Sequence, residues 1–325
     1  MALFFLVVGL EIKREFIDGE LKTWRKASFP VLAAIGGMAV PALLFSSLNP
    51  YAPQSSGWAI PMATDIAIAI GVIGLLGNKI PKSLRIFLLT LAIVDDIGSI
   101  IIITIFYNQP TNTFALIVAL ILTIGLVFVR KQKNWPILFL ILGAALWYFL
   151  LIAGVSATIA GVIVALLMPL TTNKVKINKL QVSEIIENAL IPFTAFVIVP
   201  VFVFANAGIN FSEISLKGNC SLSVFTGVIL GLFIGKPLGI LVACWVGQFT
   251  KISHKPNNIS WNQLVGVGFI AGIGFTISLL IAGLAYENSV ELQNAAILGV
   301  FTASLLSGIV GLIILKLAKS SKKSY

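Results

Sequence analysis

Two adjacent carboxylates, Asp95 and Asp96, lie inside a long apolar stretch that reads AIVDDIGSI at its centre. A third acid, Asp65, and one base, Lys236, lie in the middle of two other apolar stretches. An ionisable group at the centre of a bilayer costs about 2.5–3.5 kcal/mol on insertion scales, so such groups usually serve a function. Three acids and one base leave surplus negative charge, which suits a cation. The hydroxyl of Thr64 and the carboxylates are the hard oxygen ligands that a bare cation prefers.

A purely structural role for these charges is the alternative. An ion pair between Asp95 and Lys236 could simply join two helices. It would not account for Asp65, nor for Asp96, because neighbouring positions on a helix point about 100° apart. Lys236 could instead balance the negative end of a helix, if it does not pair with Asp95.

The composition indicates an integral membrane protein. The chain is 58% hydrophobic and 10% charged, whereas soluble domains are about 45–50% apolar and about 25% charged. The net charge of +10 is attributed to cationic loops rather than to nucleic-acid binding. The two cysteines, Cys220 and Cys244, fit neither a metal site nor a disulfide framework, and His254 is the single histidine. No cofactor is expected.

Apolar segments long enough to cross a bilayer recur along the whole chain. A spanning helix needs about 20 apolar residues. We expect an all-α polytopic fold, with ten spans at about 29–48, 58–77, 84–107, 112–129, 135–152, 154–170, 189–209, 222–249, 262–286 and 295–316. Residues 1–10 are apolar but too short to cross alone.

The basic residues predict the orientation of these spans. All but two of the 22 Lys and Arg residues fall on alternate loops or on the tail; the exceptions are Lys217 and Lys236. Because positive loops face the cytoplasm, the segment 11–28 and the C-terminus are predicted to be cytoplasmic.

Two of the expected spans are predicted to be broken. In 58–77, Pro61 removes a backbone donor just before the tripeptide ATD, whose last two residues are good N-cap types. In 262–286, Gly272 and Gly274 permit unusual backbone angles, although small residues also serve close helix packing. Non-helical backbone at this depth is tolerated where it is buried or lines a cavity.

Each broken span is the second of three. The group 29–107 and the group 222–316 enter from opposite sides by their loop charges, which is the pattern of an inverted repeat. Two breaks that cross at midplane would bring together two positive and two negative helix ends. Asp65 could balance the positive ends and Lys236 the negative ends.

Seven motifs, in order along the chain, resemble the NhaA-type sodium/proton antiporters of bacteria, a class known for inverted repeats. They are MALFFLVVGLEIKRE, AAIGGMAVPALL, GWAIPMATDIAIAIGVIGLLG, IFLLTLAIVDDIGSIIIITIFY, FANAGI, IGKPLGI and GIGFTISLLIAGLAY. The resemblance implies that Asp96 is the principal carboxylate, which binds Na⁺ or Li⁺ and exchanges it for protons. It implies that Asp95 pairs with Lys236. The implied crossing residues are Ala63, Thr64, Asp65, Gly272, Ile273, Gly274, Phe275 and Thr276.

The resemblance implies further features. Glu11, Arg14 and Glu15 match a charged cluster associated with pH-dependent activation, although an amphipathic interfacial turn would read the same. Family members usually have twelve spans, so this chain is expected to lack the first span and part of the second. That stretch carries the hairpin through which the family forms homodimers. Residues 1–320 are expected to form one transmembrane antiporter domain in the bacterial inner membrane, followed by a cytoplasmic tail at 321–325.

The function that follows is electrogenic exchange of internal Na⁺ or Li⁺ for external H⁺, activated by pH. An intramembrane aspartyl protease could use Asp65 and Asp95 to activate water, but its Gly-x-Gly-Asp signature is absent and Lys236 would have no role. A proton-coupled symporter would want a more polar or aromatic cavity. A channel would need rings of acids or carbonyls from repeated subunits.

Overall fold

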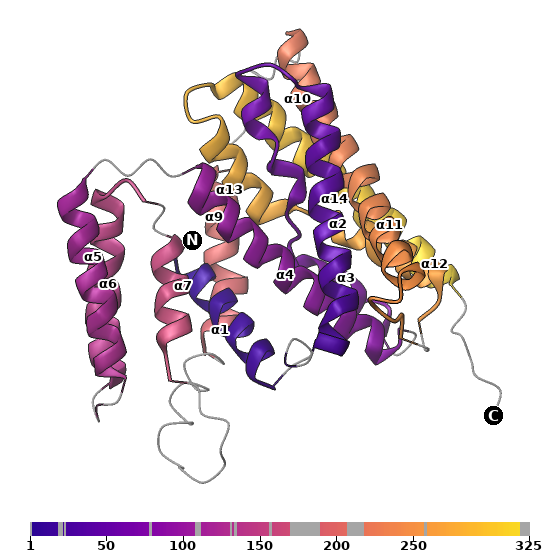
Figure 1. Cartoon of the computed structure of the whole chain (residues 1–325). Coiled ribbons are helices and arrows are strands. Elements are labelled where there is room, and N and C mark those ends of the chain that lie inside the picture. Colours follow the sequence, from indigo (N-terminus) through magenta and orange to yellow (C-terminus); the bar gives the residue numbers. More distant parts are fainter. Residues whose placement is uncertain are drawn as a thin grey trace. The chain divides into compact units, whose positions relative to one another are not determined.

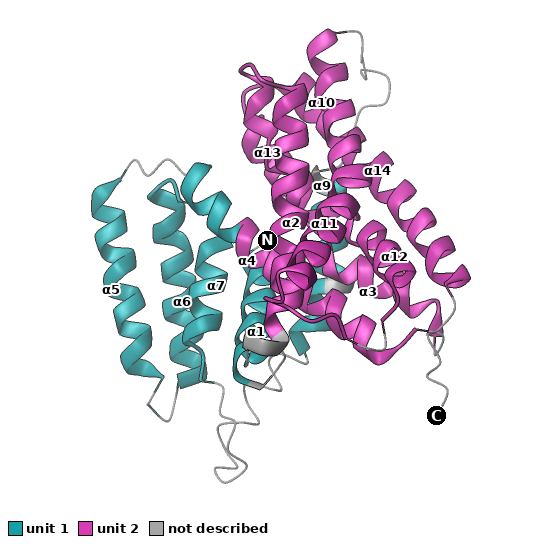
Figure 2. Ribbon diagram, turned by 45° about the vertical axis from the view of Figure 1, so that its right-hand side comes forward, with its two compact units in different colours: residues 1–22, 100–205 teal, residues 23–99, 206–325 magenta. Residues whose placement is uncertain are grey.

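A computed structural model describes residues 2–18, 22, 24–77, 80–107, 112–130, 132, 135–155, 158–169, 189–206, 218–256 and 259–318. Every regular element among these residues is a helix (Figure 1). The chain divides into two compact units, one of residues 1–22 and 100–205 and one of residues 23–99 and 206–325 (Figure 2). The predicted tail at 321–325 lies outside the described residues.

The first unit is an apolar helical bundle. Helix α1 packs against α7, and α5 packs against α6. The core of this unit includes Leu10, Trp135 and Leu146, which are fully or almost fully buried. Its helices are α1 (Ala2–Asp18), α5 (Thr113–Val129), α6 (Trp135–Ile152), α7 (Thr158–Leu167), the π-helical turn η5 (Thr194–Ile198) and α9 (Val199–Asn206).

The second unit contains all the acids and the lysine of the predicted midplane set. Helix α2 packs against α11, and α14 packs against α10 and α12. Its helices are α2 (Trp24–Leu48), η2 (Gln54–Gly57), η3 (Ile60–Met62), α3 (Ile66–Gly74), α4 (Lys82–Phe106, shared with the first unit), α10 (Asn219–Ile229), the π-helical turn η6 (Leu230–Gly235), α11 (Lys236–Phe249), α12 (Trp261–Ala271), α13 (Phe275–Ala285) and α14 (Val290–Leu317).

Each of the ten predicted spans has a helical counterpart, but not all of them are full-length. Among the described residues, 5 helices are long and apolar enough to cross a membrane, or 7 if each bent pair counts as one span. Three predicted spans correspond to shorter apolar helices, Thr113–Val129, Thr158–Leu167 and Ala189–Phe202. Gly154, with φ of 75°, lies in a turn between α6 and α7.

The two predicted breaks are confirmed. The axis bends by 41° between the helical segments Gln54–Met62 and Ile66–Gly74, and by 45° between α12 and α13. In the first pair, Ala63 is extended, with φ of −76° and ψ of 153°. Phe275 and Thr276 lie in the first turn of α13 rather than in the break. Each bent pair is the middle of three helices, as the predicted repeat requires.

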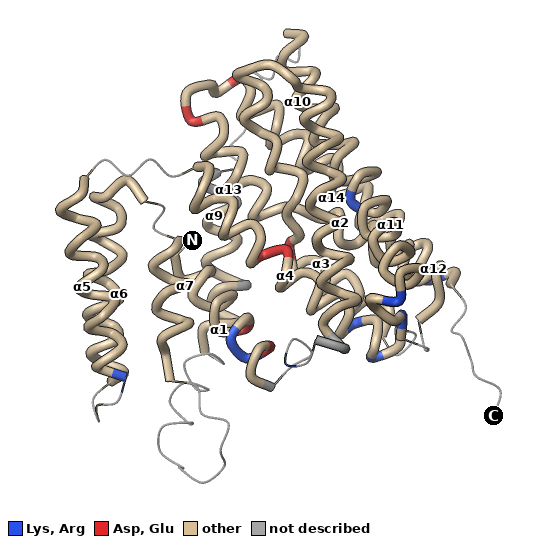
Figure 3. The backbone as a smooth tube through the Cα atoms, viewed as in Figure 1, with Lys and Arg blue, Asp and Glu red and all other residues tan. Residues whose placement is uncertain are grey.

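The surface of the helices suits a lipid environment. Large apolar side chains such as Leu120, Phe128 and Leu140 are more than half exposed on α5 and α6. The middle of α4, by contrast, carries acidic residues within largely uncharged surroundings (Figure 3). Apolar exposure on this scale is typical of helices that face hydrocarbon, and a charge in the middle of α4 calls for a specific partner or function.

Candidate cation site

Asp95 and Lys236 form a buried ion pair. Lys236 Nζ lies 2.8 Å from Asp95 Oδ2, and both side chains are completely inaccessible to solvent. The Thr64 hydroxyl lies 2.7 Å from the same oxygen and 2.9 Å from the carbonyl oxygen of Ala271. Because a hydroxyl has one proton, it donates to one of these acceptors at a time. The pair therefore links α4, α11 and the first break.

Asp96 lies beside this pair, and its side chain is 1% exposed. It interacts electrostatically with Lys236. Two carboxylates thus face one ammonium group, and the group carries surplus negative charge when all three are ionised. A buried surplus charge is costly unless a proton or another cation balances it.

Asp65 joins the two broken helices. Its Oδ1 accepts a hydrogen bond from the backbone N–H of Ile68 at 3.0 Å, so it caps the N-terminus of α3. Its Oδ2 accepts from the backbone N–H of Thr276 at 3.1 Å and from the Thr276 hydroxyl at 2.7 Å. One carboxylate therefore neutralises the positive ends of two half-helices, α3 and α13.

Lys236 also meets a negative helix end. Its Nζ donates to the carbonyl oxygen of Met62, the last residue of η3. The two roles that the sequence left as alternatives, pairing with Asp95 and balancing a carbonyl end, are therefore combined in one ammonium group. This is possible because an ammonium group has three donors.

Backbone contacts hold the two breaks against each other. The N–H of Asp65 donates to the carbonyl oxygen of Ile273 at 2.7 Å, and the Ser278 hydroxyl donates to the carbonyl oxygen of Ile60 at 2.7 Å. Backbone N–H and C=O groups that a continuous helix would pair internally are thus hydrogen-bonded across the crossing. Such pairing is required because buried backbone groups at membrane depth have no water to bind.

The π-helical turn η6 brings Lys236 to the crossing. Pro237 has no backbone N–H, so the regular hydrogen-bond ladder is interrupted just before it. A Cβ on Gly231 would lie 2.6 Å from the Cβ of Pro61, and a Cβ on Gly272 would lie 2.5 Å from the carbonyl oxygen of Leu232. Glycine at both positions is what allows the turn to lie against both breaks.

Three predicted residues belong to the first unit, whereas the cluster belongs to the second. Glu11, Arg14 and Glu15 belong to α1 in the first unit, where Arg14 is exposed and the two glutamates are half-buried. Their spacing places them on one face of that helix. Their role in a pH response stays a prediction.

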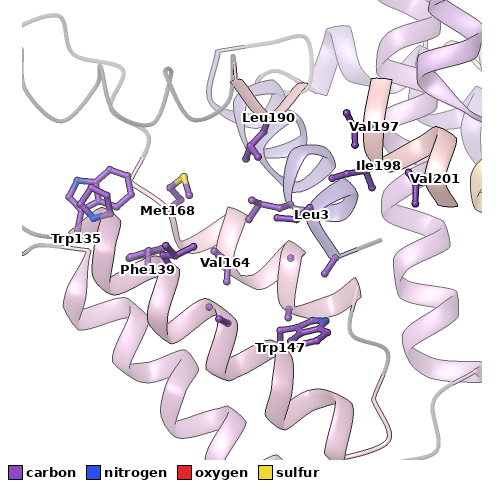
Figure 4. A pocket seen from close by; sticks show the side chains of 18 residues that line it. Leu3, Trp135, Phe139, Trp147, Val164, Met168, Leu190, Val197, Ile198 and Val201 are labelled. Carbon is purple, nitrogen blue, oxygen red and sulfur yellow. The ribbon is translucent and has the colours of Figure 1, made fainter. Parts of the chain in front are cut away.

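A large apolar pocket lies wholly within the first unit. It encloses about 860 Å³, and its walls include Leu3 on α1, Phe139 and Trp147 on α6 and Val164 on α7 (Figure 4). Its lining residues include no charged side chain. A dehydrated cation needs hard oxygen ligands, so this pocket does not suit Na⁺.

Several contacts of the site were not foreseen in the sequence. The Thr276 hydroxyl was assigned to a crossing but not as a partner of Asp65, and the roles of Met62 and Ser278 depend on which carbonyls the breaks expose. One signal was present: a proline directly after Lys236 indicates an irregular helix there. The remaining contacts join residues more than 170 positions apart, which no local pattern can pair.

Comparisons with known proteins agree with this geometry. Residues 1–315 match the family described as Na⁺/H⁺ antiporter 1. The chain is 46% identical to the Na⁺/H⁺ antiporter NhaA of Nitrobacter hamburgensis over 98% of its own length and 78% of the relative. It is 46% identical to that of Caulobacter vibrioides, with the same coverage, and 45% identical to that of Salmonella typhimurium over 96% of its own length and 80% of the relative. The chain belongs to the Na⁺/H⁺ antiporter 1 family: it is a multi-pass membrane protein and a secondary transporter that exchanges Na⁺ for H⁺, not an enzyme.

Proposed function

We propose that Asp96 is the principal carboxylate at which Na⁺ and H⁺ compete, and that Asp95, Thr64 and Lys236 complete this exchange site. The observation that carries the proposal is the arrangement of two buried carboxylates around one buried ammonium group. A proton on one carboxylate, or a Na⁺ ion between the two, would each balance the surplus charge. Because the proton and the Na⁺ ion cannot occupy the site at the same time, binding of one releases the other.

Transport in this proposal follows alternating access. Protons enter from outside and bind Asp96 and a partner, either Asp95 or Lys236, and the site then opens to the cytoplasm. Internal Na⁺ displaces the protons there and is carried out. The exchange is electrogenic if more protons than sodium ions move per cycle, and the membrane potential then drives Na⁺ out of the cell. Alkaline conditions favour Na⁺ because ionised carboxylates bind it.

The crossing supplies the fixed frame for this cycle. Asp65 holds the N-terminal ends of α3 and α13 through Ile68 and Thr276, while Lys236 reaches the carbonyl end of η3 at Met62. Discontinuous helices of this kind form substrate sites in secondary transporters. Small changes in these contacts would alter access without dismantling the site.

The finer expectations belong to the same proposal. Li⁺ is taken as a second substrate, since it is also a hard monovalent cation that prefers oxygen ligands. Glu11, Arg14 and Glu15 are proposed to mediate activation by pH. The protein is proposed to lie in the bacterial inner membrane with a cytoplasmic C-terminus, on the strength of its loop charges.

Exchange through Asp96 is testable in everted membrane vesicles that carry a pH-sensitive fluorescent dye. After respiration has acidified the lumen, Na⁺ added to vesicles with the parent chain is expected to restore the fluorescence. The Asp96→Asn variant, at matched expression, is expected to lose at least about 90% of this signal, because the amide can neither release a proton nor offer a charged ligand. Full fluorescence recovery in Asp96→Asn would rule out the site assignment, and no Na⁺ response in the parent would count against exchange by this chain.

A further inference from the structure

Ser99 follows the acidic pair by one turn of α4. It is three residues after Asp96 and four after Asp95, and side chains at both spacings are neighbours on a helix surface, with Cβ atoms about 5–6 Å apart. Ser99 therefore lies on the part of α4 that is nearest to both carboxylates.

The Ser99 hydroxyl is buried and makes no hydrogen bond within the described part of the chain. The side chain is 1% exposed, and Oγ has no hydrogen-bond partner there. A buried hydroxyl left without a hydrogen bond loses its interaction with water and gains nothing in return. Native proteins seldom keep such a group unless something binds it.

Four threonine hydroxyls on the described helices behave differently. Thr104, Thr123, Thr226 and Thr250 each have their hydroxyl within 2.6–2.8 Å of the carbonyl oxygen four residues earlier. This is the usual way in which a Ser or Thr on a helix satisfies itself. Ser99 does not use it, so its hydroxyl is available to a group that is not part of its own helix.

A second unsatisfied oxygen belongs to the same face. Asp95 Oδ2 receives Lys236 and Thr64, but Oδ1 accepts no hydrogen bond from the described residues. Two buried oxygens without donors, one turn apart on α4 and next to Asp96, would both be satisfied by one bound cation or by its last water molecule. Carboxylate and hydroxyl oxygens are the donor types that a hard cation prefers.

We infer that Ser99 is a cation-contact residue of the exchange site, whose hydroxyl oxygen contributes to the affinity for Na⁺ and to its discrimination from Li⁺. The inference rests on the proposed function of Asp96 and adds a neutral oxygen ligand to it. Because Ser99 is neutral, it changes how tightly the cation is held and leaves the proton count of the cycle unchanged.

Substitutions at Ser99 are expected to alter the apparent KM for Na⁺ and not the maximal exchange rate. Ser99→Ala is expected to raise the KM for Na⁺ about fivefold, because one neutral contact to the cation is lost. The maximal rate should stay within about twofold of that of the parent. The ratio of the KM for Li⁺ to the KM for Na⁺ should change. Ser99→Cys keeps the size of serine but offers a soft sulfur, so it should resemble Ser99→Ala. Ser99→Thr retains the hydroxyl and should keep the parent KM.

Ser83→Ala is the matched control. It removes the same atom from the same helix, about 24 Å away along α4, and Ser83 Oγ is also buried without a hydrogen-bond partner among the described residues. Its KM for Na⁺ is expected to equal that of the parent. An unchanged KM in both Ser99→Ala and Ser99→Cys, or an equal increase in Ser83→Ala, would overturn the assignment of Ser99. If Asp96→Asn remains active in the same vesicles, it is the proposed exchange site itself that fails.

Discussion

Replacing Asp95 with alanine is expected to destabilise the folded protein by about 3 kcal/mol. Breaking a buried ion pair from one side costs about 3–5 kcal/mol because the other charge stays buried. The lower end applies here, since Asp96 also interacts with Lys236 and offsets part of the loss. Thermal unfolding of the purified protein, followed by the loss of its monodisperse elution peak, measures the change.

The double variant Asp95→Ala with Lys236→Met, compared with each of the two single variants, separates a pair effect from two independent effects. It removes both charges together, so it is expected to be more stable than Asp95→Ala alone, because no ammonium group is left buried beside a neutral site. Both variants are expected to exchange ions poorly. The double variant should therefore recover stability without recovering transport. Additive losses in the single variants and the double variant would show that the two side chains do not act as a pair.

Replacing Asp65 with alanine is expected to have the second large effect. The change removes the acceptor of two backbone N–H groups and of the Thr276 hydroxyl. Each helix cap contributes about 0.5–2 kcal/mol, so the loss of two caps is expected to cost about 1–4 kcal/mol in the thermal unfolding assay. Exchange in vesicles should fall sharply as well, because α3 and α13 would no longer be held by a common group.

A cap elsewhere in the chain provides the comparison. Asn112 caps α5 by accepting one hydrogen bond from the backbone N–H of Ala115 at 3.1 Å. Asn112→Ala should cost about 1 kcal/mol and leave the KM for Na⁺ unchanged. If Asp65→Ala costs no more than Asn112→Ala, then Asp65 does not join the two half-helices. Asp65→Asn, which keeps an acceptor oxygen but loses the charge, is expected to lie between Asp65→Ala and the parent.

The positions of the two breaks could be predicted because their causes are local. Pro61 lacks an N–H and ATD supplies cap residues, so the sequence itself interrupts the first helix. Gly272 has a second cause that the sequence does not show: it lies so close to the carbonyl oxygen of Leu232 that a Cβ would not fit. The predicted breaks were therefore correct, but only part of their physical basis was visible.

The partners of the charged groups were harder to predict. Burial at midplane identified Asp65, Asp95 and Lys236 as residues that need partners, and that argument leaves several pairings open. The choice among them depends on where distant helical segments end and expose their carbonyl oxygens, as Met62 does to Lys236. It also depends on the positions of individual hydroxyls, such as that of Thr276, which a hydropathy pattern does not reveal.

The central claim is that Na⁺ and H⁺ compete for Asp96, and proton release on Na⁺ binding tests it most directly. The purified full chain, in weakly buffered solutions stepped from acidic to alkaline pH so that Asp96 is protonated at the start of the series, would receive NaCl or an equal amount of choline chloride in the presence of a pH indicator. A saturable release of protons is expected with Na⁺ alone, and it should be at least about tenfold smaller in Asp96→Asn, which has no carboxyl proton to release. Equal release from the parent and from Asp96→Asn, or no Na⁺-specific release from a parent that exchanges ions in vesicles, would contradict it.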